Sequence, residues 1–178
     1  AGGWFICGSF TEVGGQPRTG VARLNSDGTV HAFSVVLQGL VHDLALSNDT
    51  LYIGGLFSSP PTTGQRNILA VNANTGVAYG MFPGGVNNRV YALETGGSTV
   101  FAGGDFTYPN GDGPYLSRMD KTNGVTDWFF PKPNSSVYCS APDGAGGYYI
   151  GGSFSTVGGS TRNRAARINA DGTLHPWN

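Results

Sequence analysis

The chain has 178 residues, 30 of them Gly and 10 Pro, and charged residues make up only 12% of it, half the share of about 25% in a typical protein. A hydrophobic fraction of 39%, with 12% aromatic residues, is enough for a packed core and excludes a disordered chain. The formal net charge of −1 excludes the broad basic surface of a nucleic-acid binder, and no apolar run reaches the ~18–20 residues that span a bilayer. We therefore expect a folded, turn-rich protein with no nucleic-acid partner and no membrane insertion.

Two sequence markers recur along the chain with a common period. A small residue, Gly, any residue and Phe occur four times, with the Phe residues 47, 49 and 48 positions apart (Phe10, Phe57, Phe106 and Phe154). A glycine after Asp, Thr or Asn recurs every 48 residues (Gly28, Gly76, Gly124 and Gly172). The sequence therefore predicts that 1–178 is a single repeat domain or a fragment of one, with repeats at approximately 1–34 (partial), 35–83, 84–131 and 132–178.

Each period predicts four short strands, because apolar residues alternate between turn residues. First strands are expected at 41–46, 90–93 and 137–140, and second strands such as 50–53 end in the glycine pair. A third strand such as 20–25 is followed by an Asp-Gly or Asn-Gly type hairpin turn, which needs positive φ. The fourth strand carries an aromatic residue (Phe33, Phe82, Trp128 with Phe129, or Trp177).

A repeat of about 48 residues with four antiparallel strands has the size of a β-propeller blade. We therefore expect an all-β, β-propeller-type array of about four blades, and we consider a β-solenoid, whose coils are normally shorter, the second choice. The chain begins at a second strand, Trp4–Ile6, and ends after a fourth, so the first blade lacks its innermost strand. We expect this open edge to pair with a Val-x-Ala-Leu-like strand from upstream sequence or from another chain.

The last repeat resembles a known family. Its run Gly151–Gly159, followed by Arg162 and by residues 166–173, resembles the delta-60 repeat of bacterial surface and secreted proteins. The first repeat has the same run over 10–15, 18 and 22–29, whereas repeats two and three depart from it in their loops. The repeats of this chain also resemble, more loosely, those of kelch propellers and of fungal cortical marker proteins. The resemblance implies an extracellular or cell-surface propeller of unassigned biochemical role and implies no catalytic residues.

No recognisable catalytic motif is present in the sequence. There is no GxSxG, HExxH or phosphate-binding glycine loop, and we expect no enzyme and no cofactor. His31 and His175 share one repeat position, which favours a structural role. His42 and Asp43 lie on a first strand that would line the propeller axis, but neighbouring strand residues point to opposite faces, so we expect channel lining without chemistry.

Several side chains are candidates for binding or for structural roles. Arg18, Arg66 and Arg162 recur just before the third strand, and we expect each to bond carbonyls of the preceding loop rather than an anion. Asp105, Asn110 and Asp112 form an oxygen-rich loop that is a weak Ca²⁺ candidate, although an ordinary polar loop is preferred and no other metal site is expected. Together with Trp128 they are the candidate ligand-binding residues. Trp4, Trp128 and Trp177 are expected to pack between blades rather than to stack on sugars.

Cysteines and glycosylation sequons say less. Cys7 and Cys139 have the spacing of neither a metal site nor a redox motif. We expect both to be buried and unpaired, and a disulfide between them is the second choice. Asn48 and Asn134 begin N-glycosylation sequons in turn-like stretches. These sequons are compatible with an extracellular localisation.

Three function classes remain open. A non-catalytic extracellular structural or adhesive module is preferred, with other protein chains as partners through self-assembly or a supplied strand. A glycan-binding propeller is the alternative, and an enzyme with an axial active site is third; binding of a protein or peptide partner on one face is also possible. Propellers carry many functions, so the fold does not choose among them.

Overall fold

The computed structural model describes residues 2–58, 65–80, 85–107, 114–127 and 129–177. Within these ranges the chain is all β, and no helix long and apolar enough to cross a membrane is present there. Four main antiparallel sheets follow one another along the chain, and each lies within one sequence repeat.

The four sheets are numbered here in chain order. Sheet 1 consists of β1 (Gly3–Cys7) and β4 (Val21–Asn25); sheet 2 of β5 (Gln38–Ser47), β6 (Thr50–Ser58), β7 (Arg66–Asn72) and β8 (Ala78–Tyr79); sheet 3 of β9 (Val90–Gly96), β10 (Thr99–Gly104) and β11 (Leu116–Asp120); and sheet 4 of β12 (Val137–Pro142), β13 (Tyr148–Gly152) and β16 (Ala165–Ile168). Two small hairpins lie in the loops, formed by β2 (Glu12–Val13) with β3 (Gln16–Pro17) and by β14 (Thr156–Val157) with β15 (Ser160–Thr161).

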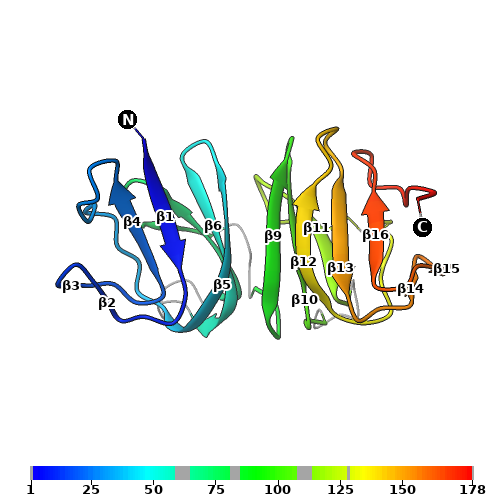
Figure 1. The fold of residues 1–178 in the computed structure, drawn as a ribbon, viewed down its shortest axis with the longest axis horizontal. Helices are drawn as coiled ribbons and strands as arrows, with labels where there is room; N and C mark the ends of the chain where they lie inside the picture. The colour runs from blue at the N-terminus through cyan, green and yellow to red at the C-terminus, as the bar shows by residue number, and fades with distance from the viewer. Residues whose placement is uncertain (1, 59–64, 81–84, 108–113, 128, 178) are drawn as a thin grey trace.

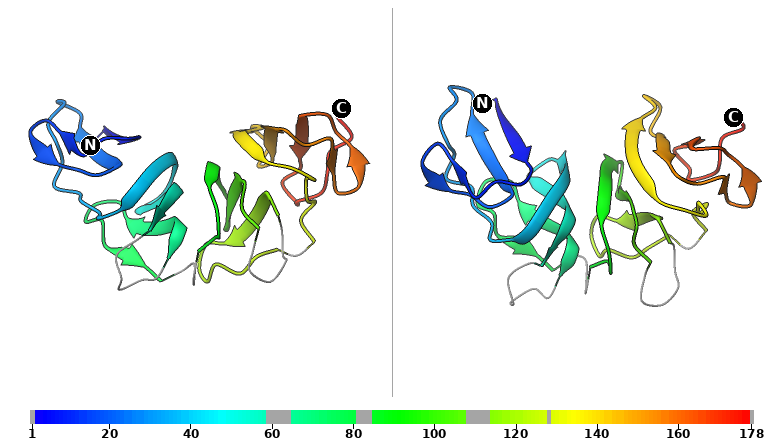
Figure 2. Two further views of the ribbon diagram at one scale, coloured as in Figure 1. Left: turned by 90° about the horizontal axis from the view of Figure 1, so that it is seen from below. Right: turned by 60° about the horizontal axis from the view of Figure 1, so that its bottom comes forward.

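The sheets stand side by side in an open arc, with the two chain ends at its opposite extremities (Figure 1, Figure 2). Each sheet has an upstream face, toward the preceding sheet, and a downstream face, toward the following one. Three buried clusters fill the three junctions, because alternate residues of each second and third strand point to opposite faces. The arc is not closed: the upstream face of sheet 1 and the downstream face of sheet 4 have no neighbouring sheet.

The expected fourth strand is wrong for three of the sheets. Among the described residues only sheet 2 has four strands, and in the other three sheets the fourth strand is reduced to single bridges such as Leu24 with Val30 and Ile168 with Leu174. The reason is local: Nδ1 of His31 accepts a hydrogen bond from the backbone N–H of Phe33 (2.9 Å), and this N–H is then unavailable to the ladder. His175 and Trp177 repeat the same contact at 2.9 Å.

The predicted hairpin glycines are confirmed. Gly28, Gly76, Gly124 and Gly172 all have positive φ, at 85, 80, 70 and 91°. Each donates its N–H back to a carbonyl at the end of the third strand, for example Gly76 to Asn72 at 2.8 Å. These turns return the chain tightly, which keeps each repeat within its own sheet.

The glycine pairs at the ends of second strands have two separate tasks. A Cβ on the second glycine would lie 2.0 Å from a carbonyl oxygen of the paired first strand, equally at Gly55, Gly104 and Gly152. A Cβ on the first glycine would collide with a valine of the following sheet, at 2.7 Å for Gly54 with Val90 and at 2.6 Å for Gly103 with Val137. The second glycine therefore allows close approach of the paired strand, and the first glycine allows close approach of the following sheet.

Candidate functional site

The three innermost strands, β5, β9 and β12, each carry one β-bulge at the same place. The ladders skip one residue opposite the glycine pair, and the skipped residues are His42, Tyr91 and Tyr138. A bulge adds one residue and redirects its side chain. The His42 and Tyr91 rings lie 5.2 Å apart, and the Tyr91 and Tyr138 rings 5.5 Å apart. Together they form an aromatic column across sheets 2, 3 and 4.

Polar groups border the aromatic column. The Tyr91 hydroxyl donates to Oδ2 of Asp105 (2.9 Å) and accepts from the Arg89 guanidinium (3.3 Å). His42 is exposed as a residue, although part of its ring is covered by its neighbours. This partial covering, together with the charge of Arg89, lowers the pKa of His42. Tyr138 is 52% exposed. The column thus offers accessible aromatic surface beside a carboxylate, a guanidinium and a hydroxyl group.

Two half-buried carboxyl groups, Asp43 and Glu94, lie on the same inner strands. Burial raises the pKa of Asp43, although its two oxygens accept hydrogen bonds from the backbone N–H groups of Leu44 (2.8 Å) and Leu93 (2.7 Å), which act in the opposite direction. Burial also raises the pKa of Glu94, and the neighbouring charge of Asp43 adds to the effect. The bond to Leu93 ties sheet 2 to sheet 3, so Asp43 has a structural task in addition to any chemistry.

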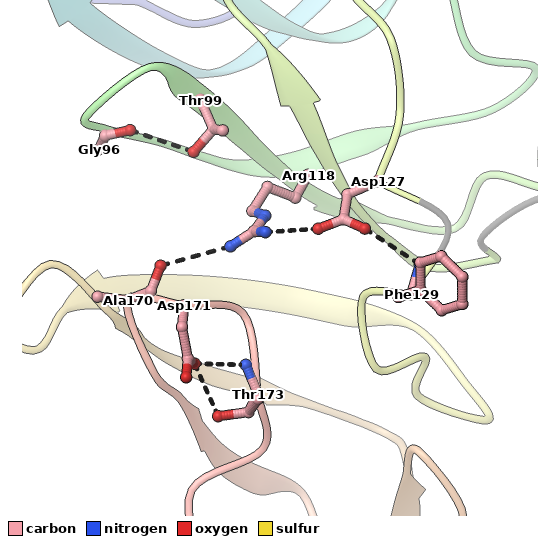
Figure 3. A network of polar contacts seen from close by, with 8 residues as sticks. All are labelled: Gly96, Thr99, Arg118, Asp127, Phe129, Ala170, Asp171 and Thr173. Atoms are coloured by element: carbon pink, nitrogen blue, oxygen red, sulfur yellow. Dashed lines mark hydrogen bonds and ion pairs between the residues drawn. The ribbon is translucent and has the colours of Figure 1, made fainter.

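A cavity of about 410 Å³ opens between sheets 3 and 4, lined among others by Arg118, Tyr148 and Asp171. Figure 3 shows the polar network beside it. The Arg118 guanidinium forms an ion pair with Asp127 and donates to the carbonyl of Ala170 at 3.4 Å. Asp171 accepts from the backbone and hydroxyl of Thr173, and these bonds lower its pKa. Because both charged groups already have partners within the protein, the cavity is a polar seam between sheets.

Two of the three repeat arginines make equivalent contacts. Arg18 donates to the carbonyl of Pro17 (2.8 Å) and to that of His31 (3.0 Å), and Arg162 donates to Thr161 (2.7 Å) and His175 (3.0 Å). One carbonyl belongs to the preceding loop, as expected, and the other to the chain beyond the third strand. Each arginine therefore clamps its hairpin loop onto its own sheet.

Arg66 is not the third member of that set, and its assignment is wrong by one residue. Each third strand has one residue with positive φ at its start: Gly20, Tyr115 and Arg164 directly precede their strands, and Asn67 is the second residue of β7. Two positions earlier stand Arg18, Gln65 and Arg162, so buried Gln65 takes the place of the arginine in sheet 2, whereas Arg66 is exposed. The loop from Phe57 to Gln65 is as long as those from Phe10 to Arg18 and from Phe154 to Arg162, and the offset arises because Phe57 follows Phe10 by 47 residues, which a fixed spacing of 48 hides.

The predicted loop cluster can be followed only in part. Asp105 is half-buried and holds the Tyr91 hydroxyl, whereas Asn110, Asp112 and Trp128 lie outside the described residues. Within the described ranges, no group of three or more His, Cys, Asp or Glu side chains is arranged to hold a metal ion.

The expected packing of the tryptophans is wrong for Trp4 and Trp177. Trp4 is 59% exposed and Trp177 46% exposed, because both lie on the end sheets of the arc, where no next sheet covers them. Phe129, next to Trp128, is also exposed, and Phe130 is the ring that fills the junction of sheets 3 and 4.

The cysteines are unpaired, but only one of them is shielded. Cys7 is half-buried, and its burial together with the charge of Asp43 raises its pKa. Cys139 is exposed, contrary to expectation, on sheet 4. Of the two sequon asparagines, Asn48 lies in an exposed turn, whereas the Asn134 amide caps a loop by bonding the Ser155 hydroxyl at 2.9 Å and two backbone N–H groups.

Comparison with known proteins bears on the repeat. A family described as a β-propeller domain of unknown function (DUF5122) matches residues 2–30 and 146–176. The chain is thus similar to a β-propeller repeat family. The two matched segments contain β1 to β4 and β13 to β16, which include sheet 1 and all of sheet 4 except β12, and the match does not single out the delta-60 repeat. No curated protein matches the chain.

Sequence reasoning missed Tyr91, Tyr138 and Glu94. Tyr91 and Tyr138 each follow the valine of a first strand, as His42 does, so a comparison of repeat positions contains the signal. Glu94 gives no such signal, because its approach to Asp43 depends on how two sheets pack.

Proposed function

We propose that the four sheets are four blades of a β-propeller and that the chain is a non-catalytic structural or adhesive module of an extracellular or cell-surface assembly, in which a strand from upstream sequence or from another chain pairs with the edge of β1. The observation that carries this proposal is the pairing of second strands. In sheets 2, 3 and 4 the second strand is paired on both sides, whereas β1 is paired only with β4.

The backbone beside Gly8, at the end of β1, leaves room for another strand. Gly8 corresponds to Gly55, Gly104 and Gly152, each of which has a first-strand carbonyl 2.0 Å from the place of a Cβ. At Gly8 only the Phe10 ring is within 4 Å of that place. Addition of a strand to an exposed sheet edge satisfies the unpaired backbone groups and is a common way for protein chains to associate.

The extracellular address rests on the resemblance to the delta-60 repeat and on the exposed sequon at Asn48. An exposed apolar edge such as Trp4–Ile6 is a liability for aggregation unless it is covered. We therefore propose assembly, rather than turnover, as the role of this edge.

A labelled peptide of residues 88–96, the first strand of sheet 3, tests the proposal. In the chain this segment pairs with β10, and the corresponding register would place it along β1. We expect saturable binding that perturbs the backbone NMR signals of β1 and leaves those of β13 unchanged. The same peptide with Glu94→Pro lacks one backbone donor and should not bind. Equal binding of both peptides, or no binding of either, would refute the proposal.

The aromatic column favours the alternative, a glycan-binding propeller. Sugar rings stack on exposed aromatic faces beside hydroxyl and carboxyl groups, and His42, Tyr91 and Tyr138 supply this combination. Screening on a glycan array should then show binding that Tyr138→Ala abolishes and that Phe129→Ala, at an exposed ring outside the column, leaves intact.

A further inference from the structure

The cavity between sheets 3 and 4 lies at a place that a lysine occupies at the preceding junction. The Lys121 ammonium group reaches back from sheet 3 and donates to the Ser47 hydroxyl of sheet 2 (2.8 Å) and to the carbonyl of Gly97 (2.9 Å). Ala170 is the equivalent of Lys121 in sheet 4, because each stands two residues after the third-strand residue that bridges to the fourth strand. Ala170 has only a methyl group, and it lines the cavity of about 410 Å³.

Glycines enlarge the same place. Gly96 stands in sheet 3 where Ser47 stands in sheet 2, since each closes the ladder between the first and second strands of its sheet. A Cβ on Gly96 would lie 2.4 Å from the Tyr148 hydroxyl oxygen, so this glycine makes room for that hydroxyl group. Gly97 and Gly146 also line the cavity. Small residues of both sheets therefore keep the junction hollow at the end where β9 turns into β10.

The charged groups of the cavity compensate one another. The Arg118 side chain is only 18% exposed, and its guanidinium group is paired with the Asp127 carboxylate. The second carboxylate, Asp171, accepts hydrogen bonds from Thr173 and lies close enough to Arg118 for the positive charge to lower its pKa. A charged ligand would lose its hydration here without gaining a free counter-charge. The cavity therefore favours a neutral ligand.

The remaining polar groups of the cavity are suited to hydroxyl groups. Nε of Arg118 is buried and has no hydrogen-bond partner among the described residues, so it can donate to a ligand oxygen. The hydroxyl groups of Ser98, Thr99 and Tyr148 also line the cavity, and each can both donate and accept. Figure 3 shows Arg118 between Thr99 of sheet 3 and Ala170 of sheet 4. A ligand with several hydroxyl groups matches donors and acceptors arranged in this way.

We propose that this cavity binds a neutral, polyhydroxylated ligand of the size of one sugar residue. Its volume lies within the range of about 300–1,000 Å³ that small-molecule sites have in proteins. The inference goes beyond the proposed function and does not depend on it. The cavity lies where β10 and β13 begin, whereas the glycine pairs opposite the aromatic column lie where these strands end.

Titration of the full chain with free monosaccharides tests the proposal. The probes are glucose, galactose and mannose, each with its uronic acid and its protonated amino sugar. We expect at least one neutral sugar to shift the backbone NMR signals of Gly97, Ser98 and Gly146 in a saturable way. Its two charged counterparts should bind at least tenfold more weakly, because neither finds a free counter-charge.

Two variants place the binding in the cavity. Ala170→Lys introduces the side chain that Lys121 has at the preceding junction and should weaken binding at least tenfold. Tyr148→Phe keeps the ring stacked on Phe101 (4.9 Å) and removes only the hydroxyl group, so it should weaken binding by about three- to tenfold. Tyr138→Ala, a change in the aromatic column, is the control and should leave the affinity unchanged.

Three results would overturn the inference. The first is that no neutral sugar shifts these signals, and the second is that a charged counterpart binds as well as its neutral sugar. The third is wild-type affinity in both Ala170→Lys and Tyr148→Phe. Loss of binding in Tyr138→Ala alone belongs to this third case, because the sugar would then lie on the aromatic column. The peptide experiment on β1 measures a different site, so its outcome is independent of all three.

Discussion

At the scale of single residues, the left-handed turns are the most strongly specified feature of the chain. The four hairpin glycines share the backbone conformation, but they differ in their surroundings. A Cβ on Gly76 would lie 1.9 Å from the carbonyl oxygen of Ser34, whereas a Cβ on Gly28 meets no atom within 4 Å. Conformational strain and steric overlap can therefore be separated at equivalent positions.

Substitution of these two glycines gives the first prediction. Gly28→Ala should cost about 1 kcal/mol of unfolding free energy, from positive φ alone. Gly76→Ala adds a backbone collision and should cost roughly 2–4 kcal/mol in all. Denaturant unfolding of both variants measures the difference, and equal losses would contradict the role of the Ser34 contact.

Glu94 predicts the pH dependence of stability. Because burial and Asp43 raise its pKa in the folded state, the folded chain holds this proton more tightly than the unfolded chain does. Its contribution to stability is therefore present at low pH, below its unfolded pKa, and is lost as the pH rises through the folded pKa. Glu94→Gln should flatten this decline in melting temperature and raise the melting temperature at neutral pH.

Asp171 is the matched control for Glu94. Hydrogen bonds from Thr173 lower its pKa, so its contribution is present at neutral pH and is lost as the pH falls. Asp171→Asn should reduce stability at neutral pH and weaken the loss on acidification. Thermal unfolding of both variants between pH 3 and pH 7 measures these effects. If the two substitutions changed the melting temperature at neutral pH in the same direction, this assignment would be contradicted.

The sequons are expected to differ in occupancy. Asn48 is exposed in a turn, whereas the Asn134 amide nitrogen is bonded to the Ser155 hydroxyl and its oxygen to backbone N–H groups. Secretion from a glycosylating host should give a glycan at Asn48 and little at Asn134. Glycopeptide mass spectrometry measures both, and Ser155→Ala should raise occupancy at Asn134 if the bond is what limits it.

At the scale of strands, each bulge and the glycine pair opposite it act together to position one aromatic ring. In each inner strand the ladder skips the residue that carries the aromatic ring, and the carbonyl oxygen two residues earlier lies against the second glycine. The close approach of this glycine therefore helps to fix where the bulge, and with it the ring, lies.

Gly104→Ala tests this arrangement. The new methyl group would overlap the carbonyl oxygen of Arg89, so we expect a loss of about 2–3 kcal/mol and displacement of Tyr91. Gly80→Ala, where no atom lies within 4 Å of the added carbon, should be nearly neutral. Unfolding measurements with the aromatic NMR signals of Tyr91 give both results, and an unshifted Tyr91 ring would separate the bulge from the glycine pair.

At the scale of the whole molecule, the arc is a linear array in which each sheet is stabilised by its neighbours. Sheets 2 and 3 are covered on both faces and the end sheets on one, as the three junction clusters show. Stability in such arrays is approximately a sum of sheet and junction contributions.

The sequence by itself determined the features that depend on a few neighbouring residues. The period, the all-β class and the positive φ of Gly28 and its equivalents follow from turn chemistry and strand order, which are local. Only the tertiary structure decided what depends on packing between sheets: the bulges that align His42, Tyr91 and Tyr138, the approach of Glu94 to Asp43, the replacement of an arginine by Gln65, and the open arc. These contacts join residues about 50 positions apart, and a loop one residue longer or shorter changes them without changing the repeat that the sequence displays.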